Sequence, residues 1–292
     1  MTIPRKPPWL QKKINPAAHA DMERLLGDQR LHTVCQEAMC PNISECFRNR
    51  QATFLILGKN CTRHCSFCNV SRERPVPPDL SEPERVAETV TRLGLGHVVI
   101  TSPTRDDLSD GGAGLFAATV REIRSTSPKT RIELLVPDFR GSRESLRVVT
   151  EAGPDILGHN VETVPRLYDI RSGADYQRSL AVLRHAAELS PSLPTKSGIM
   201  VGLGERGAEV REVLADLRRV GCVYLSIGQY LAPSRRHYPV QEFIRPEQFA
   251  SYREQALALG FAHVESGPYV RSSYLAENYG AERRQGENGG TG

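Results

Sequence analysis

Residues 53–68 read Thr53-Phe-Leu-Ile-Leu-Gly-Lys-Asn-Cys61-Thr-Arg-His-Cys65-Ser-Phe-Cys68. The apolar run at 53–57 predicts a buried β-strand, and Gly58 follows it in a predicted loop. Three cysteines with C-x3-C-x2-C spacing occupy that loop. In α/β barrels and in open parallel sheets, functional groups lie beyond the carboxyl ends of the strands. A cysteine triplet at this position therefore predicts a functional metal site.

The rest of the chain alternates between strand and helix patterns, which favours an α/β protein with a parallel sheet covered by helices. Strands are predicted at residues 53–57, 97–101, 131–136, 156–161, 195–201 and 224–229. Helices are predicted at residues 17–26, 82–93, 113–125, 142–152, 176–189, 208–220 and 246–259. Six βα repeats indicate a partial (β/α)6 barrel, with a doubly wound open sheet as the alternative.

Composition excludes several classes of protein. The chain has 292 residues, 39% of them hydrophobic and 25% charged, with a net charge of +4. Its apolar runs are too short to span a bilayer, and its first residues lack the apolar segment of a secretory signal. There is no long basic run and no RNA-binding signature. We therefore expect a cytoplasmic protein that binds neither membranes nor nucleic acids.

The chain has seven cysteines, and six of them lie between residues 35 and 68. Disulfides are rare in reducing compartments, so clustered cysteines in such a chain indicate metal binding or catalysis. The seventh, Cys222, stands in an apolar strand pattern and is interpreted as a small core residue.

The triplet of Cys61, Cys65 and Cys68 supplies three thiolates from one loop. Iron–sulfur clusters with four irons normally take four cysteines, so a triplet leaves one iron open to a substrate or cofactor. The alternative is a structural zinc site, which needs four ligands. His64 would have to be the fourth, but its place between two of the cysteines would strain it, and we favour the cluster.

A second set of cysteines, Cys35, Cys40 and Cys46, has C-x4-C-x5-C spacing. A zinc knot with His32 is one interpretation. The other is a second cluster whose fourth ligand is a distant oxygen. An oxygen ligand matches cluster iron poorly compared with thiolate, and such a weak ligand suits a cluster that is meant to come apart.

The triplet after the first strand, with Phe67 before its last cysteine, resembles the radical S-adenosylmethionine superfamily. Within it, the chain resembles the lipoyl synthase family from about residue 35 to residue 274. Besides the two triplets, the motifs of this resemblance include Ala52-Thr-Phe, Ile100-Thr-Ser, Arg105-Asp-Asp-Leu-Ser-Asp-Gly-Gly-Ala113, Val136-Pro-Asp-Phe-Arg-Gly141, His159-Asn-Val-Glu-Thr-Val-Pro-Arg166 and Arg271-Ser-Ser-Tyr274.

The resemblance implies a partial barrel of the radical S-adenosylmethionine type and two [4Fe–4S] clusters. Cys61, Cys65 and Cys68 would hold the catalytic cluster, whose open iron binds S-adenosylmethionine. An auxiliary cluster would be held by Cys35, Cys40, Cys46 and Ser273. From the residues alone, Ser272 and Ser273 would instead be interpreted as the N-cap of a helix over residues 274–279.

The implied activity is the insertion of two sulfur atoms, at carbons 6 and 8, into an octanoyl chain on a carrier lysine, with the auxiliary cluster sacrificed to make the lipoyl cofactor. The implied partners are an octanoylated lipoyl domain or glycine-cleavage H protein, an electron donor and an iron–sulfur cluster carrier. An alkyl C–H bond is beyond acid–base residues, so a cofactor must supply the hard step.

Polar residues at strand ends are the candidate S-adenosylmethionine contacts: Thr101, Ser102, Asn160 and Lys196. Each of them could instead be an ordinary strand-end hydrogen-bonding residue. Asp106, Asp107 and Asp110 either shape the same opening or form a turn with a helix N-cap at Asp110.

We expect three parts along the chain: an N-terminal extension over residues 1–50 with the auxiliary cysteines, a barrel over residues 51–270, and a C-terminal segment over residues 271–292 with the serine ligand and a frayed tail. Two alternatives lie outside this family. A sulfur-inserting enzyme of the biotin synthase kind would share only Cys61, Cys65 and Cys68, and an iron–sulfur carrier or zinc-stabilised binding module would leave the α/β body unexplained.

Overall fold

Eight strands form one sheet in chain order, from β1 to β8, in a computed structural model that describes residues 5–12 and 20–279. The first, β1, pairs antiparallel with β2, and every later neighbour pairs in parallel. The strands are β1 (His32–Thr33), β2 (Thr53–Leu55), β3 (His97–Thr101), β4 (Arg131–Leu135), β5 (Ile156–Gly158), β6 (Thr195–Val201), β7 (Tyr224–Gln229) and β8 (His263–Gly267).

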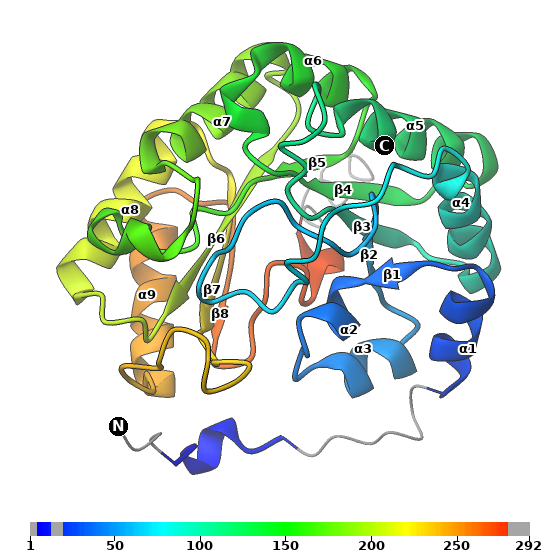
Figure 1. Cartoon of the computed structure of the whole chain (residues 1–292). Helices are drawn as coiled ribbons and strands as arrows, with labels where there is room; N and C mark the ends of the chain where they lie inside the picture. The colour runs from blue at the N-terminus through cyan, green and yellow to red at the C-terminus, as the bar shows by residue number, and fades with distance from the viewer. Residues whose placement is uncertain (1–4, 13–19, 280–292) are drawn as a thin grey trace, which may run out of the picture.

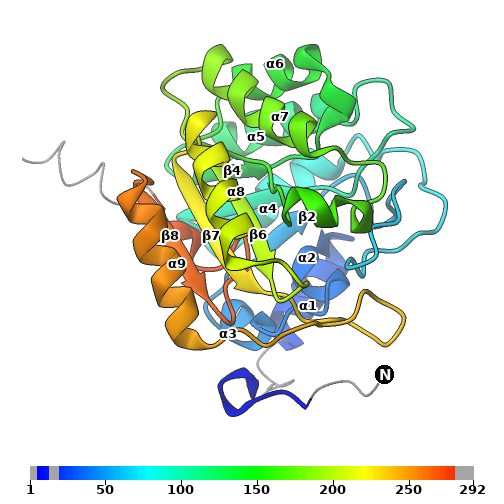
Figure 2. The same ribbon diagram turned by 90° about the vertical axis from the view of Figure 1, so that its left-hand side faces the viewer.

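Six long helices follow the parallel strands and form an outer arc around the sheet (Figure 1). They are α4 (Glu82–Leu93), α5 (Ala113–Thr126), α6 (Arg143–Glu151), α7 (Tyr176–Leu189), α8 (Gly207–Arg219) and α9 (Pro246–Ala258). Figure 2 shows α9, the last helix of this arc, running along β8 and β7. The α/β prediction is confirmed, and the sheet remains open, as in a partial barrel.

The structure differs from the sequence prediction mainly near the two ends. Strand β8 adds a seventh parallel strand, which the pattern missed because His263-Val-Glu-Ser-Gly carries one apolar side chain. In the N-terminal extension, α1 spans Ala20–Asp28, and residues 17–19 of the predicted helix lie outside the described residues, as does the expected frayed tail. The short helices α2 (Val34–Glu37) and α3 (Ile43–Arg48) were not predicted.

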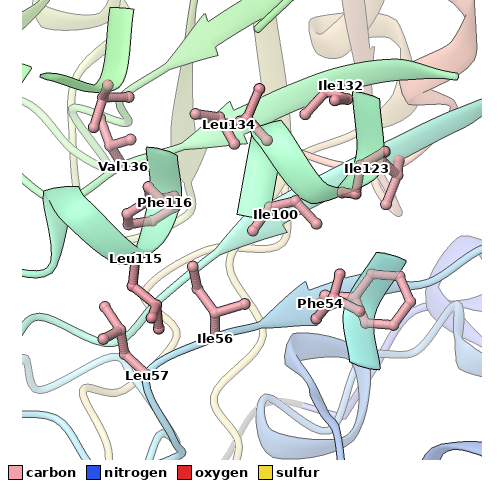
Figure 3. Packing of buried hydrophobic residues seen from close by; sticks show 14 of the residues in the cluster. Phe54, Ile56, Leu57, Ile100, Leu115, Phe116, Ile123, Ile132, Leu134 and Val136 are labelled. Atoms are coloured by element: carbon pink, nitrogen blue, oxygen red, sulfur yellow. The ribbon is translucent and has the colours of Figure 1, made fainter. Parts of the chain in front are cut away.

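Side chains alternate across the strands, as the two-residue period of a β-strand requires. Phe54, Ile100 and Leu134 point outward and pack with Phe116 and Ile123 of α5 in one buried cluster (Figure 3). A second cluster joins β6, β7 and β8 to the helices α7, α8 and α9. These two clusters hold the helices on the outer face of the sheet.

The inner face of the sheet is polar and small by comparison. The buried ammonium of Lys196 on β6 lies 2.8 Å from the carboxylate of Glu133 on β4. Gly198, two residues further along β6, lies against Asn160, Ser226 and Ser272, whose side-chain oxygens would be 2.8–3.0 Å from an added Cβ. The inner face therefore carries buried polar groups and glycine on β4, β6 and β7, beside apolar residues such as Leu55 and Val99 on β2 and β3.

The C-terminal segment packs against β7 and reaches across to β2. At Gly228 on β7, an added Cβ would lie 2.1 Å from the carbonyl oxygen of Val270, so only glycine permits this close approach. Three residues later, the Thr53 hydroxyl of β2 donates a 2.7 Å hydrogen bond to Ser273. Among the described residues, no helix is long and apolar enough to cross a membrane.

The contact at Gly228 leads to a first prediction. In Gly228→Ala, the new methyl group must push residues 270–273 off β7, which should cost about 1–3 kcal/mol as an overpacking change. The midpoint of thermal unfolding of the cluster-free protein should fall by several degrees.

Gly27→Ala is the matched control, because nothing lies within 4 Å of an added Cβ at this exposed helical position. Alanine is the better helix former, so its midpoint should stay the same or rise. A Gly228→Ala midpoint equal to that of the wild type would contradict the packing described here.

Candidate metal centres and cofactor site

The loop that carries Cys61, Cys65 and Cys68 is held in place mainly by backbone hydrogen bonds. The amide of Cys61 donates to Ser71, and the amide of Ser66 donates to Ile170 far along the chain, both at 2.8 Å. Thr62 is bound through both its amide and its hydroxyl to the carbonyl of Thr104. These bonds come from three separate segments, which together hold the loop in place.

Arg63, between the first two cysteines of this loop, anchors it from inside. Its buried guanidinium binds both carboxylate oxygens of Asp106, at 2.7 and 3.0 Å, and both of Asp138, at 2.9 and 2.7 Å. Two bidentate pairs on one guanidinium form a rigid, planar arrangement. Burial by itself would raise the pKa of Asp138, but the hydrogen bonds and the charge of Arg63, with the Arg140 amide, together hold it at about 2, so this carboxylate stays charged at neutral pH.

The three sulfurs of this loop lie near one another. Burial raises the pKa of Cys68 to about 12, with the neighbouring Cys65 and Cys61 raising it further. Burial likewise raises the pKa of Cys65. The Glu162 carboxylate adds negative charge near Cys65 and Cys68. Thiols whose pKa is raised, as for Cys65 and Cys68, are poor anions by themselves, and they suit a multiply charged metal centre that would compensate their ionisation.

The first triplet comes from the N-terminal extension. Cys35 lies on α2, Cys46 lies on α3, and Cys40 lies between the two helices. Burial raises the pKa of Cys46 to about 12, and the nearby Cys35 and Cys40 raise it further. All three cysteines line one cavity of about 560 Å³. The structure therefore brings the first triplet together, as the sequence predicts.

Ser273 lines the same cavity as the first triplet, although more than 220 residues separate it from Cys46. Thr53 lies between the two parts of this site, because it hydrogen-bonds the Ser273 hydroxyl and also contacts the Cys35 thiol. The interpretation of Ser272 and Ser273 as a helix cap is wrong: the only helical turn described beyond them spans Ala276–Asn278, and Leu275 precedes it.

The zinc alternatives each require a histidine as the fourth ligand, beside three cysteines. Zinc holds each thiolate at about 2.3 Å, so its ligands must crowd around one point. Within residues 5–12 and 20–279, no group of three or more His, Cys, Asp or Glu side chains is arranged to hold a single metal ion. His64 is exposed, and His32 lies 3.7 Å from Glu37. Cys222 is fully buried, which confirms its interpretation as a core residue.

The four candidate S-adenosylmethionine contacts fall into different settings. Ser102, just beyond β3, has a buried hydroxyl without a hydrogen-bond partner. Asn160, beyond β5, donates to Ser272 at 2.6 Å and to Glu162 at 3.1 Å. The hydroxyl of Thr101 donates to the carbonyl of Leu135 at 2.8 Å. Ser102 and Asn160 thus lie at the carboxyl ends of their strands.

Lys196 lies apart from the other three candidates, near the amino end of β6. Besides its ion pair with Glu133, its ammonium lies 3.6 Å from the ring centre of the buried Tyr279. Burial lowers the pKa of Lys196, and Glu133 opposes that shift. The side chain is therefore already engaged on two sides by groups of the protein itself.

The aspartates after β3 divide between the two alternatives considered for them. Asp106 binds Arg63 of the cysteine loop, whereas Asp107 pairs with Arg105 at 2.8 Å. Asp110 accepts hydrogen bonds from the amides of Gly112 and Gly114 at the start of α5, as a cap does.

Sequence reasoning missed several residues that shape these sites. Arg63 and Thr53 belong to quoted motifs, but their partners lie far away in the chain. The amide of Asn69, directly after Cys68, donates to the carbonyl of Glu37 at 2.7 Å and so links the two cysteine regions. Arg271 is half-buried and lines the same cavity as Cys40. His159 is buried, with Nδ1 2.9 Å from the carbonyl of Val136 and Nε2 without a partner.

Comparison with known proteins agrees with this geometry. The family described as the radical SAM superfamily matches residues 55–229. The chain is 71% identical to a lipoyl synthase from Geobacter metallireducens over 96% of its own length and 99% of the relative. It is 68% identical to a lipoyl synthase from Geotalea daltonii, with 96% and 95% covered. A lipoyl synthase from Caldicellulosiruptor saccharolyticus is 54% identical, with 94% and 96% covered.

Solved structures share the fold at low sequence identity. Methylornithine synthase has a TM-score of 0.56 at 16% identity, covering 84% of this chain and 77% of that one. The FeFe-hydrogenase maturase HydG from Carboxydothermus hydrogenoformans has a TM-score of 0.56 at 14% identity, with 80% and 65% covered. These likenesses concern the fold alone.

The environment of His159 generates a prediction on pH dependence. Burial, and next the charge of Arg171, lower its pKa to about 4. A histidine whose folded-state pKa is depressed contributes its full stability above its unfolded pKa of about 6.5, and this stability is lost as pH falls toward 4. Between pH 7.5 and pH 5 the loss should be about 2 kcal/mol for the cluster-free protein.

His159→Gln keeps a donor for Val136 but cannot take up a proton, so its free energy of unfolding should fall less on acidification. Urea titrations at the two pH values measure the difference, with the partly exposed His237→Gln as the control. Equal acid sensitivity in wild type and His159→Gln would refute the assignment.

Proposed function

Because the chain belongs to the lipoyl synthase family of the radical SAM superfamily, we propose that it inserts two sulfur atoms, at carbons 6 and 8, into an octanoyl chain carried on a lysine of a partner protein. S-adenosylmethionine and a [4Fe–4S] cluster belong to the chemistry of this superfamily. We further propose a second, auxiliary cluster as the sulfur source, which makes that cluster a substrate rather than a permanent cofactor.

The observation that carries this proposal is the position of Ser273 in the cavity of the first triplet. Three thiols and one hydroxyl, drawn from opposite ends of the chain, line this cavity and would form a four-point ligand set. A hydroxyl binds iron less well than a thiolate does, so this set includes one ligand that is easily displaced. Such a set is suited to a cluster that must open to release sulfur.

The second triplet has three thiols in a preformed loop and therefore suits a cluster with one open iron. When bound there, such a cluster supplies the single electron that cleaves S-adenosylmethionine, a step that no acid–base residue can replace. The protein's own part is positioning and the exclusion of water. Arg63 fixes the loop through Asp106 and Asp138, and the partial burial of Cys68 limits the access of water to its thiol.

We propose that Ser102 and Asn160 are the S-adenosylmethionine contacts best supported by position. The unpartnered hydroxyl of Ser102 would gain a hydrogen bond from a bound ligand. Thr101 and Lys196 remain candidates beside them, and their polar groups are engaged by Leu135 and Glu133, as the Asn160 amide is engaged by Ser272.

The proposed reaction also defines its partners. A lipoyl domain or a glycine-cleavage H protein, octanoylated on lysine, would present the substrate. An electron donor is needed because each S-adenosylmethionine cleavage consumes one electron, and a cluster carrier is needed because the auxiliary cluster is used up. In this scheme residues 1–50 carry the sulfur source, residues 51–270 form the barrel, and residues 271–292 supply its serine ligand.

Quantifying iron and sulfide after anaerobic reconstitution tests the proposal. The wild type should bind about eight irons per chain, and a Cys35→Ala, Cys40→Ala, Cys46→Ala variant should bind about four. Cys222→Ala, which removes a buried thiol outside both sets, should keep about eight. The triple variant should still cleave S-adenosylmethionine but insert no sulfur into an octanoyl-lysine peptide. Zinc in place of iron, or only four irons in the wild type, would contradict the proposed auxiliary site.

The two adjacent serines provide a sharper test. Ser273→Ala removes the fourth ligand of the first triplet, so auxiliary iron should be lost to a chelator about tenfold faster or more, which is the factor that about 1.4 kcal/mol represents. Ser272→Ala is the matched control, because this serine hydrogen-bonds Asn160 rather than Thr53, and it should retain auxiliary iron as the wild type does. Equal iron loss from both variants would argue against Ser273 as a ligand.

A further inference from the structure

Lys12, in the N-terminal extension, contacts residues that neighbour Cys46 and residues that neighbour Ser273. Its ammonium donates to the Glu45 carboxylate at 2.6 Å and to the Asn42 side-chain oxygen at 2.8 Å. Glu45 directly precedes Cys46, and Asn42 lies between Cys40 and Cys46. The Lys12 ammonium therefore binds two side chains at the start of α3: Asn42, which precedes the helix, and Glu45, which lies in its first turn.

Both partners of Lys12 in turn bind the C-terminal segment. The hydroxyl of Tyr274 donates to the other carboxylate oxygen of Glu45 at 3.1 Å, and the buried amide of Asn42 donates to the carbonyl of Tyr269 at 2.7 Å. Tyr274 directly follows Ser273 in the chain. Two parallel bridges thus run from Lys12 to the segment that carries the serine.

The ammonium also faces the two tyrosine rings directly. It lies 5.1 Å from the ring centre of Tyr269 and 5.8 Å from that of Tyr274, within the range of cation–π attraction. About a quarter of the Lys12 side chain and a third of the Glu45 side chain remain exposed. The ion pair is therefore only partly screened by water.

We propose that Lys12 is a positioning residue that clamps Ser273 against the first cysteine triplet, through Glu45–Tyr274 on one side and Asn42–Tyr269 on the other. This inference rests on the proposed function, because it assigns the clamp to the auxiliary iron site. Cys46 lies on α3, and Ser273 lies in the segment after β8, so no backbone pairing of strands joins them. Side-chain bridges must therefore set the distance between them. Strengthening or loosening the clamp sets how readily the serine leaves the iron.

The test uses the full-length chain with Cys61, Cys65 and Cys68 replaced by alanine, so that all bound iron reports on the first triplet. In this background, Lys12→Met should lose iron to a ferrous-iron chelator about tenfold faster, as expected for removing hydrogen bonds to a charged group. Lys12→Arg, which keeps the charge, should recover part of the difference. In the otherwise wild-type holoenzyme, Lys12→Met should cleave S-adenosylmethionine at a rate within about twofold of the wild type.

Arg147→Met is the matched control, because Arg147 also forms ion pairs with two carboxylates, those of Glu144 and Glu151, but on helix α6. It should leave the rate of iron loss unchanged, and the unfolding midpoints of the two variants should be similar. This comparison separates a local effect on the serine from a general loss of stability.

A double-mutant cycle identifies the route. Lys12→Met and Tyr274→Phe act through the same Glu45, so their combined effect on iron loss should be smaller than the product of the single effects. Unchanged iron loss in Lys12→Met, or effects that simply multiply, would overturn the clamp while leaving the proposed function intact. If the first triplet binds no iron even with Lys12 present, both the clamp and the proposed auxiliary site are overturned.

Discussion

The parallel sheet begins at β2 and ends at β8, and within the described residues these two strands do not pair with each other. Unpaired strand edges must be covered by other parts of the chain. The N-terminal extension covers the β2 edge through β1, and residues 269–274 run from β7 toward β2, where Thr53 meets Ser273. Because these two coverings meet at the same opening, cysteines from one end of the chain and a serine from the other can share one cavity.

The inner face of the sheet reflects the same openness. A closed barrel fills its interior with layers of side chains, whereas here the inward positions include glycine, serine and a buried ion pair between Glu133 and Lys196. Two buried charges cost desolvation, and they are tolerated only when they are well paired. Tyr279 completes this arrangement, because its ring lies against the Lys196 ammonium and its hydroxyl donates to Leu225. This buried group lies near the amino end of β6, whereas Ser102 and Asn160 lie beyond the carboxyl ends of β3 and β5.

The two cysteine sites are held by different kinds of interaction. The loop of the second triplet is bound by backbone amides and by the doubly paired guanidinium of Arg63, which is largely buried. The first triplet meets its serine through Thr53 and through partly exposed side chains such as Glu45. A loop held by its backbone suits the proposed catalytic cluster, which would stay in place through many turnovers. A site joined by side chains from separate segments suits the proposed auxiliary cluster, which would have to be released and replaced.

Much of the fold could be read from local pattern, because apolar periodicity and loop residues act over short distances. These local patterns predicted six of the parallel strands and the helices between them. They also placed Cys61, Cys65 and Cys68 in the loop after the first of these strands. Strand β8 could not be predicted in this way, because it has few apolar residues and is held in the sheet by contacts with α9 and β7. The spacing of the two triplets predicted metal binding. The auxiliary cluster and its serine ligand were suggested by family resemblance, whereas local propensity favoured a helix cap at Ser272 and Ser273. Only the tertiary structure could join Ser273 to Thr53, or Lys12 to Tyr274, because contacts across hundreds of residues depend on how the sheet edges are covered and leave no periodic trace in the sequence.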